Sequence, residues 1–311
     1  MSAAASPLAL EAGGLRFSNP VLLASGTAAY GREVAGVMDL DVLGGIVTKA
    51  VSVEPRRGAP APRVAEWSGG MVNAVGLANP GVGRVRAEEL PWLAKNVRDA
   101  RVLVNVVGRE AGDFAIVVGA LDAEPGLDAF ELNVSCPNVK AGGLEFGADE
   151  TALRAVVAGC RAVTRRPLFV KLSPTLGDVA AAARVAVDAG ADGITLVNTL
   201  PGLVIDVHKR RPALGLGSGG VSGHGLLPVG VLATAKVRKA VGVPLIGVGG
   251  VSSADDALQY MIAGASLVAI GTAALRDPRA PERIIRDLET WCASNRVRSI
   301  GDIVGTLEWP A

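Results

Sequence analysis

A cysteine follows an apolar run near the middle of the chain, in the stretch Asn133-Val-Ser-Cys136-Pro-Asn-Val-Lys-Ala-Gly-Gly143. The run itself, Ala129–Leu132, predicts a buried strand, which Pro137 should end because proline has no N–H for the ladder. Cys136 would then lie on a loop just beyond the strand. A free thiol titrates near pH ~8.5, so modest tuning suits it to act as a general base. The alternative is a small buried hydrophobic residue.

Two lysines interrupt apolar runs in the same way. Lys49 stands in Ile-Val-Thr-Lys-Ala-Val, and Lys171 stands in Leu-Phe-Val-Lys-Leu. Burying an unpaired ammonium costs several kcal/mol, so each lysine should face an anionic or strongly polar partner, or else reach solvent at a strand end. The repeated setting favours the polar partner.

Glycines follow two apolar runs near the C-terminal end of the chain. Gly249-Gly250 follows one run, and Gly271, with Thr272 after it, follows the other. The first pair precedes a helix start that Ser253 can cap. Backbone N–H groups and a helix dipole at such a place can hold a phosphate without a cationic side chain. Tight strand–helix packing that needs glycine is the alternative.

These residues can meet only in a fold that brings strand ends together. Eight apolar runs in the sequence indicate the strands of such a fold. The runs are Val21–Ala24, Gly45–Thr48, Val102–Val107, Ala129–Leu132, Leu168–Leu172, Gly193–Val197, Pro244–Val248 and Leu267–Ile270. Most are continuous, as expected of parallel strands covered on both faces. Predicted helices between them include Glu88–Ala100, Thr151–Val163, Asp178–Ala189, Val231–Ala240 and Ala254–Ala263. A doubly wound sheet also alternates in this way, but eight runs with polar ends favour a (β/α)8 TIM barrel.

The remaining segments fit a single domain over residues 1–311. Residues 1–20 predict a hairpin, turned at Gly13-Gly14, that caps the bottom of the barrel. Residues 51–83 and 200–227 are rich in Gly and Pro and predict lid or interface excursions above the barrel. Gly215-Leu-Gly-Ser-Gly-Gly220 matches GxGxxG but follows no strand, so we interpret it as a loop and expect no nicotinamide-binding domain.

Composition excludes several classes of function. The 311 residues carry a net charge of +1, which recruits no nucleic acid by charge alone. The three cysteines lie far apart, so we expect no zinc, iron–sulfur cluster or other metal on this chain, and a reducing, cytoplasmic location. No segment predicts a membrane span. His208 and His224 have no metal-ligand neighbours in the sequence and are interpreted as non-catalytic.

Three motifs resemble the dihydroorotate dehydrogenase family: Asn133–Gly143, Asn73-Ala-Val-Gly-Leu77 and Lys171-Leu-Ser-Pro. The cysteine at position 136 resembles the residue found there in the soluble class 1. The segment Lys140-Ala-Gly-Gly-Leu-Glu-Phe-Gly147 resembles the corresponding sequence of subclass 1B. The chain departs from the family at Thr27-Ala-Ala-Tyr30, where relatives often have a Phe-Gly step. This departure bears on packing at the flavin edge.

The resemblance implies oxidation of (S)-dihydroorotate to orotate, in UMP biosynthesis, with bound FMN. It implies that Cys136 removes the C5 proton, that Lys171 meets the flavin's pyrimidine edge, and that Lys49 lies between flavin and substrate carboxylate. The implied FMN-binding residues are Ser25, Lys49, Ala50, Asn105, Asn133, Lys171, Val197, Gly223, Gly249, Gly250, Gly271 and Thr272. The implied substrate-binding residues are Lys49, Asn73, Ala74, Val75, Gly76, Leu77, Asn133, Asn198 and Thr199.

Subclass 1B further implies a partner subunit that carries FAD and a [2Fe–2S] cluster, with NAD+ as final acceptor. The implied assembly is a heterotetramer of two chains each, built on a homodimer of this chain. Four alternatives stay open on the sequence: a fumarate-dependent class 1A enzyme, an FMN barrel acting on another pyrimidine, a flavin-carrying scaffold subunit, and a phosphate-sugar barrel without flavin.

Overall fold

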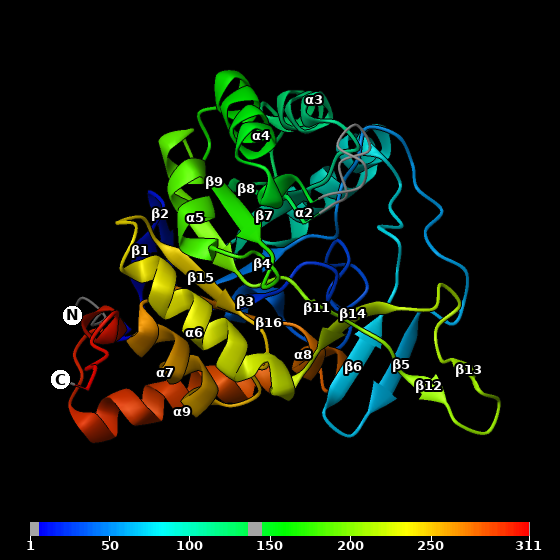
Figure 1. Ribbon diagram of the computed structural model, residues 1–311. Helices are drawn as coiled ribbons and strands as arrows, with labels where there is room; N and C mark the ends of the chain where they lie inside the picture. Colours follow the sequence, from blue (N-terminus) through cyan, green and yellow to red (C-terminus); the bar gives the residue numbers. More distant parts are fainter. Residues whose placement is uncertain (1–5, 136–144, 311) are drawn as a thin grey trace.

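The computed structural model describes residues 6–135 and 145–310, so Cys136 and its neighbours up to residue 144 lie outside the described residues. Eight parallel strands close into a barrel in the order β10-β15-β16-β3-β4-β7-β8-β9, with helices around it (Figure 1). The predicted (β/α)8 TIM barrel is therefore confirmed.

Each predicted apolar run contains one barrel strand, and the bounds agree to within one residue at each end. The strands are β3 (Val21–Leu23), β4 (Gly45–Val47), β7 (Arg101–Val106), β8 (Ala129–Asn133), β9 (Leu168–Leu172), β10 (Gly193–Leu196), β15 (Leu245–Val248) and β16 (Leu267–Ile270). One run was misjudged as wholly apolar, because Glu131 lies in the middle of β8 with 1% of its surface exposed.

The helices agree with the predictions less closely at their ends. They are α1 (Val82–Arg84), the π-helical turn η2 (Val85–Glu89), α2 (Leu90–Asn96), α3 (Ala111–Leu121), α4 (Glu150–Val163), α5 (Val179–Asp188), α6 (Leu227–Arg238), α7 (Ala254–Ala263), α8 (Thr272–Arg276) and α9 (Ala280–Asn295). Short 3-10 turns are η1 (Leu40–Val42), η3 (Phe146–Ala148), η4 (His224–Leu226) and η5 (Ile300–Ile303). Helix α6 begins before the predicted Val231 because Pro228 fits a first turn, where its missing N–H costs nothing.

Two layers of apolar side chains fill the molecule. One lies between strands and helices and includes Val104, Phe130 and Val170. The other lies inside the barrel and consists of alternate strand residues such as Leu103, Ala129 and Phe169, as the period of two in a strand requires. Residues of one face in each strand therefore line the barrel interior, where the polar strand ends also lie.

The N-terminal end of the barrel interior is covered by a hairpin of β1 (Leu10–Ala12) and β2 (Leu15–Phe17). Ala12 and Phe17 pack into the interior cluster. Gly13 and Gly14, both with positive φ, make the turn between the strands. Because this end is closed by apolar packing, a ligand has to enter from the opposite end.

The two long excursions pair with each other, which the sequence did not predict. β5 (Val64–Trp67), β6 (Gly70–Asn73), β11 (Leu200–Gly202) and β14 (Gly219–Ser222) form one antiparallel sheet in the order β11-β14-β6-β5. Figure 1 shows this sheet beside the barrel, at the end opposite β1 and β2. A small ribbon of β12 (Ile205–Asp206) and β13 (Arg211–Pro212) extends from it.

The prediction that Gly215–Gly220 is entirely loop was wrong, because Gly219 and Gly220 begin β14. Glycine is needed there for close approach of the backbones. A Cβ on Gly219 would lie 2.3 Å from the carbonyl oxygen of Asn73, and one on Gly220 would lie 2.0 Å from Oγ1 of Thr199.

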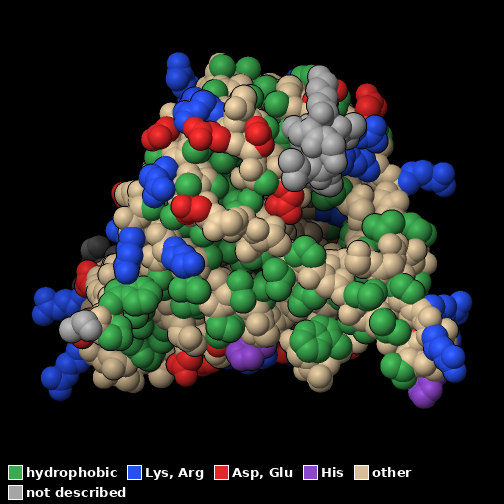
Figure 2. Space-filling view, viewed as in Figure 1, with side chains coloured by type: hydrophobic (Ala, Val, Ile, Leu, Met, Phe, Trp, Pro, Cys, Tyr) green, Lys and Arg blue, Asp and Glu red, His purple; other side chains and the backbone are tan. Residues whose placement is uncertain are grey.

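The surface at this end of the molecule is partly apolar. Figure 2 shows hydrophobic side chains over the region of the excursions, and the large hydrophobic residues exposed on them include Trp67, Ile205 and Val207. Among the helices of the described ranges, none has the length and apolarity that a membrane crossing requires.

Candidate active site

The barrel interior changes from apolar to polar toward the C-terminal ends of its strands. Along β8 the interior-facing residues are Ala129, Glu131 and Asn133, and along β9 they are Phe169 and Lys171. Strand pairing sets Asn133 beside Lys171. The polar residues therefore share one end of the barrel, which is where TIM barrels place their active sites.

Lys171 is held at this end by two contacts. Its Nζ donates to Oγ of Ser25 at 3.2 Å and lies 3.9 Å from Oε1 of Glu131. Nδ2 of Asn105 donates to the same Glu131 oxygen at 2.7 Å. Lys171 has 6% of its surface exposed. Its side chain therefore faces polar partners and does not reach solvent.

A second cluster joins the ends of β8 and β10. Nδ2 of Asn198 donates to Oδ1 of Asn133 at 3.1 Å, and the backbone N–H of Thr199 donates to Oδ1 of Asn198 at 2.9 Å. Thr199 lies against Gly220 of β14, whose carbonyl accepts a 3.2 Å hydrogen bond from Nδ2 of Asn73. Four predicted substrate-binding side chains are thus linked through two strand ends and the small sheet.

The segment Ala74–Leu77 leaves β6 as a tight turn, with positive φ at Gly76 and Leu77. The N–H of Ala59 donates to the carbonyl of Val75 at 3.0 Å. A Cβ on Gly76 would lie 2.4 Å from that same Ala59 nitrogen, so glycine is required by packing here. Ala74 is buried, and its role toward a substrate stays a prediction.

Lys49 and Ala50 follow β4. The N–H of Lys49 donates to the carbonyl of Ala29 at 2.7 Å, and the hydroxyl of Tyr30 donates to the carbonyl of Ala50 at 3.3 Å. Burial, followed by the nearby Glu89 carboxylate, raises the pKa of Tyr30, so its hydroxyl stays neutral as a donor. The segment that departs from the family thus anchors this strand end. Within the described residues, no hydrogen bond joins the half-buried Lys49 side chain to Lys171 or Asn133.

The glycine-rich end is built from three segments. Gly249 and Gly250 follow β15 with positive φ, Gly271 follows β16, and Gly223 follows β14 with a φ of 102°. In the described part of the chain, the N–H groups of Gly250, Gly271 and Thr272 donate to no protein acceptor. Oγ1 of Thr272 donates to Oγ of Ser222 at 2.8 Å, which ties α8 to β14.

Glycine at position 250 is also required by packing, because a Cβ there would lie 2.5 Å from the nitrogen of Leu227. The packing alternative raised from the sequence therefore applies to this residue, and its role toward a phosphate stays a prediction. Nδ1 of His224 lies 3.2 Å from the carbonyl oxygen of Gly250, at the edge of the same end. Partly exposed backbone donors without acceptors can receive a phosphate.

Some predicted residues lie apart or outside this description. Cys136, the predicted base, lies outside the described residues. Val197 follows β10 and is buried. Cys160 and Cys292 are buried in α4 and α9, and burial raises the pKa of Cys160 to about 12. The described part of the chain brings together no cluster of metal-ligating side chains.

Sequence reasoning missed Glu131. The sequence could have indicated this residue, because a carboxylate within a continuous apolar run is as unusual as the lysines at positions 49 and 171. It also missed Thr195, which faces the interior of β10 beside Lys171. The side-chain oxygens of Thr195 and of Asn105, Oγ1 and Oδ1, are buried without a hydrogen-bond partner.

These polar groups fit FMN. Asn105 and Lys171 offer an unpaired acceptor and a cation for a flavin ring at the barrel end. The unpaired N–H groups of Gly250, Gly271 and Thr272 offer donors for its phosphate. Buried polar atoms are rarely left without partners, so their joint occurrence at one end indicates a polar ligand.

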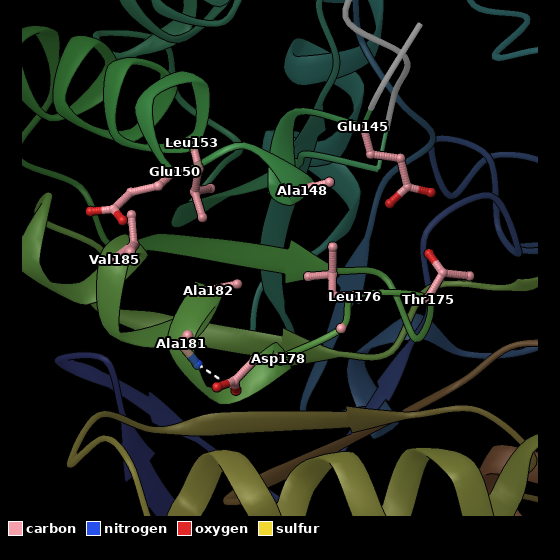
Figure 3. Close-up of a pocket in the computed structure, with 12 residues that line it drawn as sticks. Glu145, Ala148, Glu150, Leu153, Thr175, Leu176, Asp178, Ala181, Ala182 and Val185 are labelled. Atoms are coloured by element: carbon pink, nitrogen blue, oxygen red, sulfur yellow. Dashed lines mark hydrogen bonds between the residues drawn. The ribbon is translucent and has the colours of Figure 1, made fainter.

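A further cavity of about 500 Å3 lies outside the barrel, between α4 and α5 (Figure 3). Its wall includes Glu145, Thr175 and Asp178, but none of the predicted site residues. Burial raises the pKa of Glu145, against the hydrogen bond it accepts from Ser173. We place the site at the barrel end because the cluster of linked polar side chains lies there.

Comparison with known proteins identifies the family. The family model described as dihydroorotate dehydrogenase matches residues 7–291. Three curated relatives are each named "Dihydroorotate dehydrogenase B (NAD(+)), catalytic subunit". The one from Pelobacter propionicus is 46% identical over 295 residues, covering 95% of this chain and 96% of its own. The one from Desulforudis audaxviator is 46% identical over 297 residues, covering 96% of each chain. The one from Cutibacterium acnes is 44% identical over 296 residues, covering 95% and 96%.

A solved structure agrees in fold. The crystal structure of DHODH in complex with ferulenol from Eimeria tenella matches with a TM-score of 0.81 and 22% identity, covering 98% of this chain and 90% of that chain. At this identity the likeness concerns the fold alone. The match of the family model across the barrel, together with the relatives, shows that the chain belongs to the dihydroorotate dehydrogenase family.

Proposed function

We propose that this chain is the catalytic subunit of an NAD-linked dihydroorotate dehydrogenase, which oxidises (S)-dihydroorotate to orotate in pyrimidine biosynthesis. The observation that carries the proposal is the linked cluster of Asn133, Asn198 and Thr199 beside the buried cation of Lys171. Amide side chains supply both donors and acceptors, as a ring with two amide edges requires. The relatives' printed names supply the reaction and the acceptor.

The chain's residues divide the work as follows. Ser25, Asn105 and Lys171 would hold the flavin ring, and the backbone at Gly250, Gly271 and Thr272 would hold its phosphate. Bound FMN would accept the hydride that leaves C6 of dihydroorotate.

On the substrate side, Asn73, Asn133, Asn198 and Thr199 would orient the ring. The ammonium of Lys49 would meet the substrate carboxylate. Cys136 would take the proton from C5 on the opposite face of the ring, as a general base. The remaining predicted residues of the substrate loop, Ala74, Val75, Gly76 and Leu77, would close the site with their backbone.

Electrons have to leave the reduced enzyme. We propose that a second subunit with FAD and a [2Fe–2S] cluster receives them and reduces NAD+, in a heterotetramer that contains two copies of each chain. The apolar surface at the excursions, with Trp67, Ile205 and Val207, suits a lasting contact between copies of this chain. We place the enzyme in the cytoplasm, where its thiols stay reduced.

The test uses the purified chain. It should show the absorbance of FMN, lose that absorbance when dihydroorotate is added without oxygen, and leave it unchanged with dihydrouracil. Alone it should reduce dyes but hardly NAD+, and co-expression with the proposed iron–sulfur flavoprotein should restore NAD+ reduction. A colourless protein, or one that prefers dihydrouracil, would contradict the proposal. Efficient turnover with fumarate would assign the chain to class 1A.

A further inference from the structure

The carboxylate of Glu131 is buried in the barrel interior. It lies two residues before Asn133 along β8, so it lies about 7 Å further from the strand's C-terminal end. Its side chain is 1% exposed, and its residue pairs directly with Asn105 on one neighbouring strand and Phe169 on the other. Its side chain therefore offers almost no surface to a ligand.

Glu131 contacts two residues that are predicted to hold the flavin. Its Oε1 lies 3.9 Å from Nζ of Lys171 and accepts a 2.7 Å hydrogen bond from Nδ2 of Asn105. The Lys171 side chain is 7% exposed, so the two opposite charges face each other with little water between them. Solvent screens such a pair weakly, and its electrostatic effects reach further than those of surface pairs.

Packing alone does not explain the pair. The layer directly below is apolar and well filled, with Leu103, Ala129 and Phe169. A buried ion pair is seldom more stable than apolar residues of similar volume, because both charges lose their hydration. The pair also leaves Oδ1 of Asn105 without a partner. Its position at the boundary between the apolar interior and the polar end points to a role toward the ligand.

We infer that Glu131 lowers the reduction potential of the bound flavin by offsetting the positive charge that Lys171 presents to it. This inference rests on the proposed function, because it requires FMN beside Lys171. Reduction adds negative charge to the flavin's pyrimidine edge, which a nearby cation stabilises and a nearby anion disfavours. Lys171 would contact the ring and favour the reduced form. Glu131 would act on the flavin by its own negative charge, which opposes the charge of Lys171 without contact with the ring, and so would keep the reduced flavin a strong enough donor for an NAD-linked acceptor.

The experiment measures the midpoint potential of bound FMN without oxygen, against reference dyes, in wild type, Glu131→Gln, Lys171→Met and the double variant. Glu131→Gln keeps the shape and the Asn105 contact but removes the charge. It should raise the potential by at least about 30 mV, which is a tenfold change in the two-electron equilibrium constant. Lys171→Met should lower the potential, and the double variant should lie between the two single variants.

Two further variants separate charge from structure. Glu131→Asp keeps the charge and should leave the potential closer to wild type than Glu131→Gln does. Glu89→Gln removes a different buried carboxylate, which is 7% exposed and pairs with Arg32 at 3.1 Å outside the barrel. It should leave the potential unchanged. A role in folding alone would lower the melting temperature or the FMN content without moving the potentials in opposite directions.

An unchanged or lower potential in Glu131→Gln overturns the inference. If that variant does not fold with FMN, the double variant replaces it, because it leaves no uncompensated buried charge. Its potential should then exceed that of Lys171→Met, and an equal or lower value overturns the inference. The proposed function is judged separately on wild type: absence of FMN or of dihydroorotate oxidation there refutes the function, whereas a flat potential in the variants refutes only the role of Glu131.

Discussion

The side-chain amide of Asn198 donates to the side-chain carbonyl of Asn133 at 3.1 Å, and so joins the end of β10 to the end of β8 across β9. Each asparagine also fixes local backbone, because Oδ1 of Asn133 accepts from the N–H of Ser135 and Oδ1 of Asn198 accepts from that of Thr199. Oδ1 of Asn133 thus accepts two bonds, whereas Oδ1 of Asn198 accepts one and keeps a lone pair. Among the described residues, the remaining Nδ2 hydrogens have no acceptor, so the pair presents donors and an acceptor at fixed positions.

Replacing Asn198 by alanine should lower kcat/KM for dihydroorotate roughly 5- to 150-fold. The loss corresponds to about 1–3 kcal/mol for a buried hydrogen-bonded group removed from a network. FMN content should change little, since Asn198 is predicted to bind the substrate and not the flavin. Steady-state kinetics with a flavin absorbance check would measure both. Asn96→Ala, which removes an exposed amide that donates to the Trp92 carbonyl, is the matched control and should retain wild-type kinetics.

Cys136→Ala should keep the yellow colour and lose turnover by several orders of magnitude, because the C5 proton then has no base. Cys292→Ala, a substitution at a buried cysteine of α9, provides the comparison and should keep its turnover. Anaerobic stopped-flow reduction by dihydroorotate measures the step directly. Equal reduction rates in the two variants would show that Cys136 is not the base.

The two other cysteines should resist alkylation in the native protein. Burial raises the pKa of Cys160 to about 12 and also raises that of Cys292. A raised pKa means a smaller thiolate fraction at any given pH, so at pH 8 iodoacetamide should label Cys136 alone, and native Cys136→Ala should not be labelled. Mass spectrometry after digestion identifies the labelled residue. Rapid labelling of Cys160 at pH 8 would contradict the packing of α4.

Gly220→Ala should disturb the joint between β14 and the barrel end. The new Cβ would meet Oγ1 of Thr199 at 2.0 Å, so Thr199 or the strand has to move. We expect a loss of about 1–3 kcal/mol of stability and a raised KM for dihydroorotate. Gly242→Ala is the control, since a Cβ there meets nothing within 4 Å. Urea unfolding and kinetics on both variants would show whether the effects are specific to Gly220.

Gly250→Ala should weaken the binding of the FMN phosphate by the backbone at this position. Its φ of 79° is unfavourable for alanine, and the Cβ would lie 2.5 Å from the nitrogen of Leu227. The affinity for FMN should therefore fall more than that for riboflavin, which lacks the phosphate. Fluorescence titration of the flavin-free protein with both compounds gives the ratio. A ratio equal to that of wild type would show that this backbone does not bind the phosphate.

The barrel itself could be predicted from the sequence because its cause is local. Parallel strands covered on both faces require continuous apolar runs, and runs such as Leu168–Leu172 and Leu267–Ile270 have no other simple explanation. The same local logic singled out Lys171, because a charge within such a run needs a partner. The family followed from short motifs whose residues stand close together in the chain.

The partners of these residues were decided by the tertiary structure alone. Which carboxylate faces Lys171 depends on the register of β8 against β9, and a shift of one residue would turn Glu131 out of the barrel. The contact of Asn73 with Gly220 joins segments 147 residues apart, which no local pattern encodes. A sequence specifies each strand's faces through its own periodicity, but the pairing of distant faces is settled only when the whole barrel closes and its buried polar groups must find one another.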